Sequence, residues 1–351
     1  MSATICFFNA NNLFLRYKWG KKYPGDISGK SYVSSPKWGY LPAYNSGSFK
    51  PFRPVQTAIS AATVISEDYP DILCMCEVES ILALRSFNES YLNNHYEYAY
   101  LVDSRDYRQI DVCILSNKEI LGIRSHVDDR DKNGNFIFSR DCLEVNVALN
   151  KSGSKRITLF INHLKLKFVD KRNKSADEIE KEIKAANLRR LSQSNYVREL
   201  VKSRFPDTEF SNGNFVVLGD FNDQPDSQWV EPLTKDANLF NVLDLLPEEE
   251  RWTYWWKSRN RVSQIDYFLL SPSLSEKVVQ ENIKPRVERR GIGFKRILEN
   301  DEIRPKTTRV FKTDEDPHPL GINFGFQRFS TVLNPKQHAS DHCPIFLELP
   351  I

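Results

Sequence analysis

Long hydrophobic runs are absent from this 351-residue sequence, and no apolar stretch approaches the length of about 20 residues that a membrane-spanning helix needs. The N-terminal segment MSATICFFNANNLF lacks the basic residues, the apolar stretch and the small-residue cleavage site of a secretory signal. The proportions of 40% hydrophobic and 27% charged residues are ordinary for a globular protein. We therefore expect a cytoplasmic protein without a membrane span.

Strong charge bias and paired cysteine clusters are also lacking. A net charge of +3 does not by itself indicate a polyanionic partner. The Cys74-x-Cys76 pair has no second cysteine pair that would complete a zinc site, and the sequence shows no other ligand for it. Most cysteines stand inside apolar runs, where they resemble small buried hydrophobic residues: Cys6, Cys74, Cys76, Cys113, Cys142 and Cys343. The sequence indicates a reduced protein without structural zinc, and no obligate protein partner is evident.

Apolar, β-branched runs alternate irregularly with helical stretches. We predict helices from Pro54 to about Ser66 and from Ser175 to about Arg204, the second opening with the capping-box pattern Ser175-Ala-Asp-Glu178. Irregular alternation predicts a four-layer α/β/β/α sandwich, in which two packed mixed β-sheets are flanked by helices. The predicted strands are Thr4–Asn9, Ile72–Cys76, Tyr96–Leu101, Ile110–Leu115, Leu143–Leu149, Ile157–Ile161, Phe215–Leu218, Gln264–Leu270 and Pro344–Leu349.

We expect residues 1–351 to form a single domain with long loops at about 20–53 and 282–336. Loops of this length in a compact domain are commonly functional. Both contain aromatic and basic residues, which suit a surface that stacks on bases and contacts phosphates. We therefore predict that they face the substrate.

Polar side chains stand where the apolar runs begin or end. A charged group at the end of a buried strand costs several kcal/mol unless it is paired or binds a metal. Because polar residues occur at the ends of many predicted strands, we expect their side chains to meet in one pocket. Asn9 and Asn11 follow ICFF, Glu77 follows DILCMC, His163 follows ITLFIN, Asp220 and Asn222 follow FVVLG, Asp341 and His342 precede CPIFLEL, and Asp266 lies inside QIDYFLL. Carboxylate, imidazole and amide groups are what phosphodiester hydrolysis needs to activate water, hold a cation and protonate the leaving oxygen.

The same stretches carry a family resemblance. FFNANN, PDILCMCEVE, YRQIDVCILS, FINHLKLK, VVLGDFNDQP, QIDYFLLS and SDHCPIFLEL resemble, in order, the motifs of the endonuclease/exonuclease/phosphatase superfamily, which includes deoxyribonuclease I and abasic-site endonucleases. The resemblance runs from Asn9 to Leu349. The forms YRQID, NHLK and GDFND are most similar to its predicted extracellular-nuclease branch. The resemblance implies the sandwich fold and metal-dependent hydrolysis of phosphoesters.

Residue by residue, the resemblance implies distinct roles. Glu77 would be the principal ligand of Mg²⁺, or of Mn²⁺ or Ca²⁺, helped by Asn9, Asp341 and Asn11. Asp220 would orient and deprotonate the attacking water, and Asn222 would position that water or the phosphate. His342, held by Asp266, would contact the scissile phosphate, and His163 would contact the phosphate or the leaving group.

Further residues are candidates for phosphate binding, namely Arg108, Asn162 and Lys165. Arg108 could instead form an exposed ion pair. Asp111 resembles the aspartate of the family motif RxID, and its alternative role is structural. The basic run Lys165, Lys167, Lys171, Arg172 and Lys174 is either a track for a phosphate backbone or a solvated face. Glu79 and Asp223 are interpreted as surface residues or as neighbours of the site.

The leading hypothesis is a Mg²⁺-dependent endonuclease acting on nucleic acid, DNA before RNA. The alternative is hydrolysis of inositol phosphates, phospholipids or other small phosphoesters on the same core. No WCDR-like element precedes SDH, which argues against inositol-phosphate 5-phosphatases, and the start FFNANN differs from the WNVNG of abasic-site enzymes. A catalytically inactive binding module would require loss of a core residue, and Glu77, Asp220, Asn222, Asp266 and His342 are all present.

Overall fold

The computed structural model describes residues 2–19, 32–33, 49–51, 55–259, 261–293, 302–303, 309–310, 320–321, 326–332 and 337–350. Most of the predicted loops 20–53 and 282–336 lies outside these residues, so their contact with substrate stays a prediction. Within the described part of the chain, no helix has both the length and the apolar character needed to cross a membrane.

The first of two large sheets has the strand order β16-β21-β1-β5-β7-β6. In it β1 pairs in parallel with β5 and antiparallel with β21, so the sheet is mixed. Its strands are β16 (Arg286–Val287), β21 (Ile345–Pro350), β1 (Ser2–Leu13), β5 (Ile72–Val78), β7 (Asp111–Ser116) and β6 (Tyr98–Leu101).

The second large sheet has the order β12-β15-β11-β10-β9-β8. Here β10 and β11 are parallel, and β15 runs antiparallel to β11. Its strands are β12 (Phe240–Asn241), β15 (Asp266–Leu270), β11 (Phe215–Asp220), β10 (Arg156–His163), β9 (Cys142–Ala148) and β8 (Ile120–Ser125). Each predicted strand overlaps an observed one, whereas β8 and the two-residue strands β12 and β16 were not predicted.

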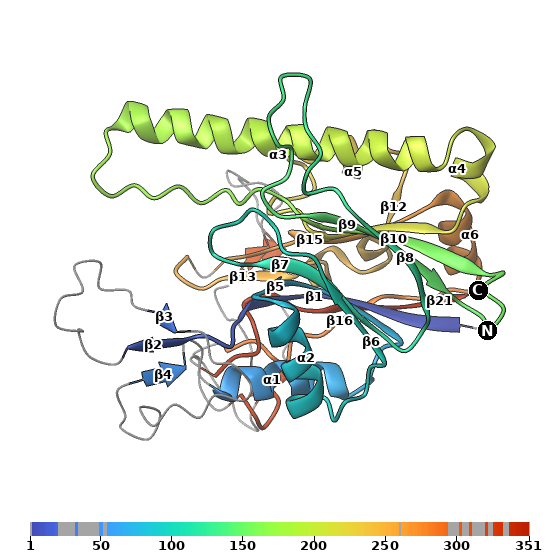
Figure 1. Ribbon diagram of the computed structural model, residues 1–351, viewed down its shortest axis with the longest axis horizontal. Coiled ribbons are helices and arrows are strands. Elements are labelled where there is room, and N and C mark those ends of the chain that lie inside the picture. Colours follow the sequence, from blue (N-terminus) through green and yellow to red (C-terminus); the bar gives the residue numbers. More distant parts are fainter. Residues whose placement is uncertain are drawn as a thin grey trace.

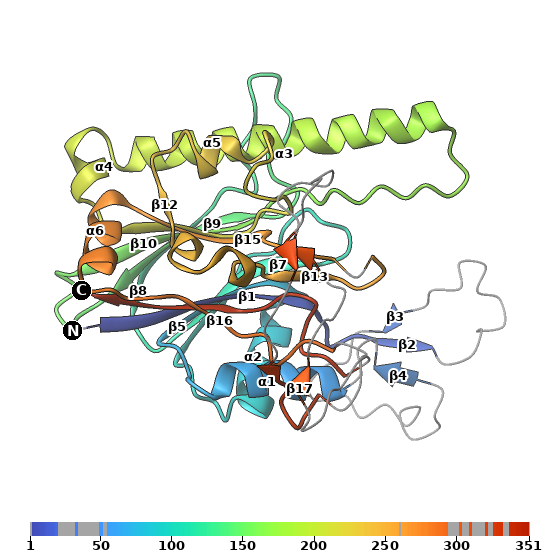
Figure 2. The same cartoon turned by 180° about the vertical axis from the view of Figure 1, so that it is seen from behind.

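Helices cover the outer face of each sheet (Figures 1 and 2). Helices α1 (Val55–Ser66) and α2 (Ile81–Tyr91) lie on the first sheet, and α3 (Ala176–Arg204) lies along the second. The predicted four-layer α/β/β/α sandwich is therefore confirmed. The remaining helices are α4 (Thr208–Asn212), α5 (Glu231–Thr234), α6 (Pro272–Gln280), and the 3₁₀ turns η2 (Val242–Leu245) and η3 (Glu248–Glu250).

Short strands make three smaller sheets. They are β13 (Tyr254–Trp256), β14 (Arg261–Ser263), β18 (Arg309–Val310) and β19 (Leu320–Gly321) in one, β17 (Glu302–Ile303) and β20 (Phe326–Gln327) in another, and β3 (Tyr32–Val33), β2 (Tyr17–Trp19) and β4 (Phe49–Pro51) in the third.

Strand β5 shows why the apolar runs are nearly continuous. Its side chains alternate between the core that separates the two sheets, which includes Cys74 and Cys76, and the core beneath α1 and α2, which includes Leu73 and Met75. Because both faces are covered, both sets of side chains must be apolar. The first residue that departs from this pattern is Glu77, which is only partly buried.

Helix α3 is anchored by buried polar contacts. The predicted capping box is present, since Ser175 accepts from the backbone of Glu178 and Glu178 accepts from that of Ser175. In the middle of the helix, the guanidinium of the fully buried Arg190 lies 2.9 Å from Asp223 Oδ2 and donates to the backbone carbonyl of Lys165 at 2.7 Å. These bonds fix the helix to the segments that follow β10 and β11.

A second anchor surrounds His126, which is 3% exposed. His126 Nδ1 lies 2.6 Å from Asp129 and Nε2 lies 3.0 Å from Glu144. From α3, Tyr196 donates to Asp129 and Arg204 donates to Glu144. Burial alone would lower the pKa of His126, but the bonds to the two carboxylates outweigh it and raise that pKa above its ordinary value.

The raised pKa gives His126 a pH-dependent effect on stability. A raised folded-state pKa stabilises the protein fully below the unfolded value of about 6.5, and this contribution is lost as pH rises through the folded value. We therefore expect His126→Asn to lower the free energy of unfolding more at about pH 6 than at about pH 9, measured by urea titration. His95→Asn is the control, because His95 is exposed. An equal loss for His126→Asn at both pH values would contradict this reading.

Gly219 allows β11 to approach β10 closely at the end that precedes Asp220. Its φ is +146°, and a Cβ at this position would lie 2.1 Å from the backbone carbonyl oxygen of Asn162. Glycine is therefore required here by both the dihedral angle and the space.

We expect Gly219→Ala to lower the free energy of unfolding by about 2 to 4 kcal/mol, because the backbone of β10 or β11 must shift. The matched control is Gly122→Ala on the edge strand β8, where the nearest atom to an added Cβ is 4.0 Å away. The control should change stability by less than about 1 kcal/mol. Equal urea-unfolding midpoints for the two variants would disprove the steric argument.

Candidate active site

Strand ends from both large sheets meet at one edge of the sandwich. The carboxyl ends of the parallel pairs β1 and β5, and β10 and β11, lie beside the amino ends of the antiparallel strands β15 and β21. Polar side chains at these ends come together: Asn9 from β1, Glu77 from β5, His163 from β10, Asp220 from β11, Asp266 from β15 and His342 just before β21. We call these six residues the edge cluster. The sequence pattern predicted this convergence.

Polar contacts connect four members of the edge cluster in series. Asp266 Oδ2 lies 2.9 Å from His342 Nδ1, and His342 Nε2 lies 3.4 Å from Asn9 Nδ2, a long contact that is not a hydrogen bond when the ring is protonated. Asn9 Nδ2 also donates to Asp220 Oδ2 at 3.0 Å. The other oxygen of Asp220 accepts from the backbone N–H of Asn222 at 2.8 Å. Because all of these groups are buried, the bonds hold the Asp220 carboxylate in one orientation.

Burial and neighbouring charges both shift the pKa values of Asp220 and His342. Burial raises the pKa of Asp220 to about 7, His342 lowers it in part, and Asp266 adds to the rise. Burial alone would lower the pKa of His342, but the carboxylates of Asp266 and Asp220 outweigh it and raise that pKa to about 10. The site thus holds a protonated imidazole beside a carboxyl group that ionises near neutral pH.

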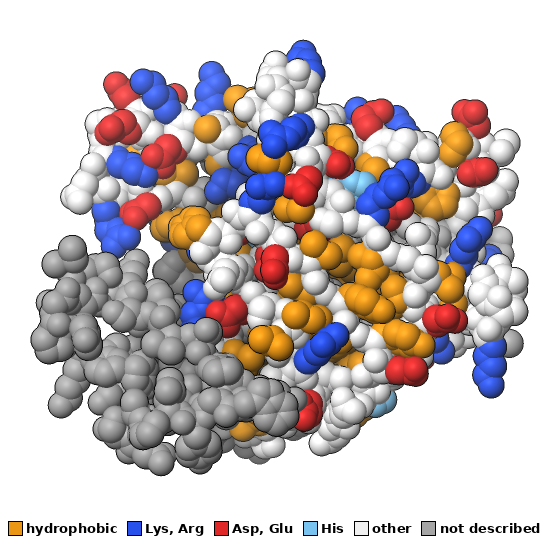
Figure 3. All heavy atoms as spheres, in the orientation of Figure 1, with side chains coloured by type: hydrophobic (Ala, Val, Ile, Leu, Met, Phe, Trp, Pro, Cys, Tyr) orange, Lys and Arg blue, Asp and Glu red, His pale blue; other side chains and the backbone are white. Residues whose placement is uncertain are grey.

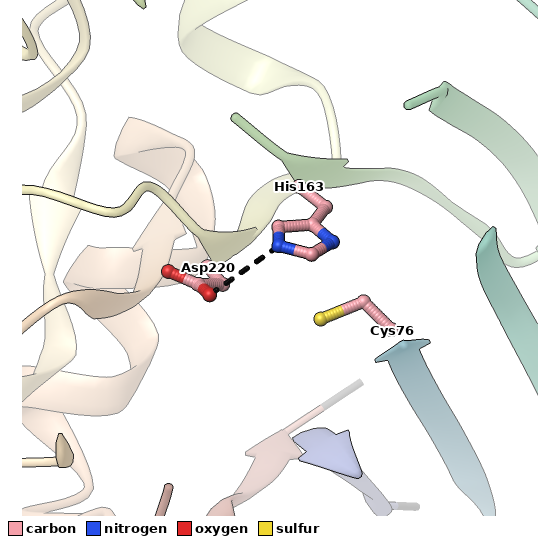
Figure 4. Close-up of side chains that lie close together, drawn as sticks. All are labelled: Cys76, His163 and Asp220. Carbon is pink, nitrogen blue, oxygen red and sulfur yellow. Dashed lines mark ion pairs between the residues drawn. The ribbon is translucent and has the colours of Figure 1, made fainter. Parts of the chain in front are cut away.

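His163 stands opposite Asp220 at the end of the neighbouring strand (Figure 4). Its Nε2 lies 3.6 Å from Asp220 Oδ2 and 3.8 Å from Glu77 Oε1, and both distances are too long for hydrogen bonds. Burial lowers the pKa of His163 well below its ordinary value, and the nearby cations Arg140 and Arg108 lower it further. The ring is therefore neutral.

Several residues at this edge have left-handed backbone. Asn11, Glu77 and Asn222 have φ values of +46°, +61° and +55°. Asparagine tolerates this region, but a glutamate there is uncommon. The pairing register between β5 and β7 also shifts between Met75 and Val78, so β5 is irregular at Glu77. Backbone strain of this kind concentrates at functional sites.

Oxygen ligands for a hard cation lie at the mouth of the edge cluster. The side chain of Glu77 is 19% exposed, and Asp341 is partly exposed as well. Asp341 accepts a hydrogen bond from Asn11 Nδ2, so the side chains of these two predicted ligands are in direct contact. Asn9 directs Nδ2 into the cluster and Oδ1 toward the backbone N–H of Asn11, so its amide would have to turn over to bind a metal through oxygen.

Of the three predicted phosphate-binding residues, Arg108 and Lys165 lie near each other, whereas Asn162 is directed elsewhere. Arg108 forms a bidentate ion pair with Asp106, whose side chain is only 7% exposed, and a phosphate contact of Arg108 stays a prediction. Asn162 is fully buried on the face of β10 opposite to His163, in the layer of Phe160, and its Nδ2 donates to the Phe160 carbonyl. Lys165 is half-buried, and burial together with Arg140 and Arg108 lowers the pKa of its amine. The structure therefore does not bring Asn162 into the edge cluster.

Carboxylates accompany most of the basic run. Lys167 pairs with Asp223, Arg172 with Asp170 and Lys174 with Glu182. Over α3, Lys and Arg side chains are interspersed with Asp and Glu (Figure 3). These pairs favour the solvated face over a continuous phosphate track.

Three residues with undecided roles are buried. Asp111 accepts from the backbone N–H of Ser104, and burial raises its pKa to about 6. Glu79 is paired with Arg16, and Asp223 with Arg190. Glu79 and Asp223 are therefore structural partners beneath the surface.

Sequence reasoning missed several residues that support the site. The buried Arg140 donates to Asp106 and to the Leu164 carbonyl, Thr253 Oγ1 accepts from the backbone of Asp266, and Ser340 Oγ donates to the Asn9 carbonyl. The ring of Tyr254 lies 4.8 Å from that of His342. Of these, only Ser340 carried a sequence signal, since it stands in the SDH stretch.

Comparison with known proteins gives the family. The model of the Endonuclease/Exonuclease/phosphatase family matches residues 44–342, and no curated protein matches the chain. An endonuclease/exonuclease/phosphatase family protein from Bacteroides thetaiotaomicron is 14% identical with a TM-score of 0.54, over 99% of this chain and 97% of its own. Truncated Caenorhabditis elegans TDP2 is 12% identical with a TM-score of 0.52, over 100% and 98%.

A mannosyl-6-phosphatase from Bacteroides thetaiotaomicron is 15% identical with a TM-score of 0.51, over 100% of both chains. At such identities these structures show a common fold. The family match covers most of the chain, including five of the six residues of the edge cluster and omitting Asn9. The chain therefore belongs to the endonuclease/exonuclease/phosphatase family, whose members hydrolyse phosphoester bonds.

Proposed function

We propose that this protein is a Mg²⁺-dependent phosphodiesterase that cleaves nucleic acid, DNA in particular, and that residues 1–351 form one catalytic domain. The observation that carries the proposal is the edge cluster itself. It combines a carboxyl group that ionises near neutral pH, a protonated imidazole and a partly exposed glutamate, which are three complementary groups for hydrolysis of a phosphodiester.

The donor set fits a hard divalent ion, which members of this family use. Glu77 and Asp341 offer carboxylate oxygens at the mouth of the cluster, and Asn11 offers an amide. Mn²⁺ and Ca²⁺ accept the same oxygen ligands and would be the replacements. When bound at Glu77, such an ion would neutralise charge on the non-bridging oxygens of the phosphate.

The residues around the ion would perform the proton chemistry. Asp220, held by Asn9 and by the backbone of Asn222, would accept a proton from the attacking water. His342, protonated and fixed by Asp266, would donate a hydrogen bond to the phosphate as negative charge develops. The neutral His163 would contact the phosphate or the leaving oxygen from the opposite side.

The choice of nucleic acid is supported by the loops and by the sequence forms. The segments at 20–53 and 282–336 contain the aromatic and basic residues that suit stacking and phosphate contact. The sequence similarity to the predicted extracellular-nuclease branch also favours nucleic acid as the substrate, and the assignment to that branch stays a prediction. A sugar phosphate is the competing substrate class, because the mannosyl-6-phosphatase has the same fold.

Supercoiled plasmid tests the reaction and the metal together. We expect nicked and linear products in Mg²⁺ and none in EDTA, and we expect Asp220→Asn or Glu77→Gln to lower the rate by about 10³-fold. The control variant is Asp236→Asn, whose side chain is 55% exposed and lies outside the edge cluster. Cleavage that survives EDTA, or that is normal in Asp220→Asn, would refute the proposed mechanism.

The substrate class is tested with the same variants. If the plasmid stays intact, single-stranded DNA and RNA are tried next, followed by phosphoinositides and mannose 6-phosphate. Hydrolysis of a small phosphoester alone, lost in Asp220→Asn, would replace the nuclease proposal by the alternative.

His342 and Asp266 should act as one unit. We expect His342→Asn and Asp266→Asn each to lower kcat/KM by about 10²-fold to 10³-fold, and the double variant to lose little more than either single variant. The physical reason is that Asp266 acts through the ring that it holds at 2.9 Å. Losses that multiply in the double variant would show that the two residues work independently.

A further inference from the structure

The side chain of Cys76 points toward those of His163 and Asp220, which are two members of the edge cluster (Figure 4). Cys76 is the residue of β5 directly before Glu77 and is fully buried. Its Sγ and one atom each of His163 and Asp220 all lie within 4.8 Å of one another. The three side chains come from three strands in two sheets, so no spacing in the sequence indicates that they meet. Zinc was not expected from the sequence, because Cys74-x-Cys76 has no second cysteine pair and no other ligand was evident, whereas the fold brings His163 and Asp220 to Cys76.

His163 has an unusual environment within this group. The ring is 2% exposed, its Nδ1 is a buried atom without a hydrogen-bond partner among the described residues, and Nε2 makes only the two long contacts to carboxylates. Of the two ring nitrogens, Nε2 is the one that faces Asp220 and Glu77, and it has no partner at hydrogen-bond distance within the described part of the chain, so a bound ion would give this atom a partner. An ion at Nε2 leaves Nδ1 unpaired as far as the residues that the structure describes are concerned.

The spacing of these atoms suits a shared metal ion. Two ligands bonded at about 2.0 to 2.1 Å to one tetrahedral zinc lie about 3.4 Å apart. His163 Nε2 and Asp220 Oδ2 lie 3.6 Å apart, which is close to that separation and too long for a hydrogen bond. Cys76 Sγ lies within 4.8 Å of both atoms, and a shift of its side chain that brings these distances to about 3.5 Å would complete three ligands, which leaves the fourth position to water or to Glu77.

We propose that Cys76, His163 and Asp220 form a binding site for a thiophilic divalent ion, with Zn²⁺ as the reference ion. A thiolate, an imidazole and a carboxylate select such ions, whereas the oxygen ligands around Glu77 suit Mg²⁺. The thiol proton leaves to solvent when sulfur binds the ion. Since Asp220 would be both a ligand of Zn²⁺ and the base of the reaction, occupation by Zn²⁺ inhibits hydrolysis, and this consequence rests on the proposed function.

Cobalt binding tests the site without any assay of activity. The full chain is titrated with Co²⁺, a tetrahedral substitute for zinc that gives a near-ultraviolet charge-transfer band when a thiolate binds it. We expect the band in the unmodified protein and its loss in Cys76→Ser and Cys76→Ala, with affinity for Zn²⁺ weakened by at least about 100-fold in competition with a chromophoric chelator. The matched control is Cys74→Ser, which changes the buried cysteine two positions earlier on the same strand and should keep the band.

Three results would overturn the site: no band in the unmodified protein, a band that persists in both Cys76 variants, or a band that is lost equally in the Cys74 control. Thermal melting by circular dichroism verifies that each variant is folded. His163→Asn supplies a second ligand variant, which should weaken cobalt binding and keep the sulfur band at saturation.

The inhibitory consequence is measured separately. In the plasmid assay at fixed Mg²⁺, we expect the Zn²⁺ concentration for half-inhibition to rise at least about tenfold in Cys76→Ala, relative to that variant's own rate without zinc. Cobalt binding through Cys76 with no hydrolysis of any substrate would sustain the site and refute the proposed function. EDTA-sensitive hydrolysis without a cobalt–thiolate band would support the proposed function and refute the Cys76 site.

Discussion

The hydrogen bond from Asn9 Nδ2 to Asp220 Oδ2 joins the two sheets at the edge where the polar residues meet. Asn9 belongs to β1 in the first sheet and Asp220 to β11 in the second, and each strand lies inside its sheet. The position of each side chain therefore depends on how the sheets are packed. A small rotation of one sheet over the other would separate Asp220 from both Asn9 and His342, although every strand would remain intact.

Much of this arrangement could be predicted from sequence, because polar residues that interrupt apolar runs mark strand ends. The positions of Glu77, Asp220 and His342 followed from that pattern. What could not be predicted is which face of a strand a residue occupies and what stands across from it. Asn162 and His163 are adjacent in sequence but point to opposite faces of β10, and Cys76 meets partners from the other sheet. The helices α2 and α6 and the strand β8 were missed although each contains apolar residues. In each of them one large apolar residue is exposed, namely Leu82, Val279 and Leu121, so the apolar pattern does not mark a single buried face.

The cluster is held in place at a cost to folding. Asp220, Asp266 and His342 are almost fully buried, and Glu77 has an unfavourable backbone angle. The surrounding layers compensate, since the core between the sheets and the cores beneath the helices are continuous with the strands that carry these residues. The site is thus rigid because it stands at the ends of the most deeply buried strands.

Arg190 limits which residues can occupy the middle of α3. Its one side chain reaches Asp223, the carbonyl of Lys165 and the side chain of Asn187. A lysine has a single nitrogen at the end of a flexible chain and cannot reproduce that planar fork, so even this conservative exchange would leave buried acceptors without donors. Among naturally occurring variants of this protein, position 190 should therefore vary less than the exposed basic residues of the same helix.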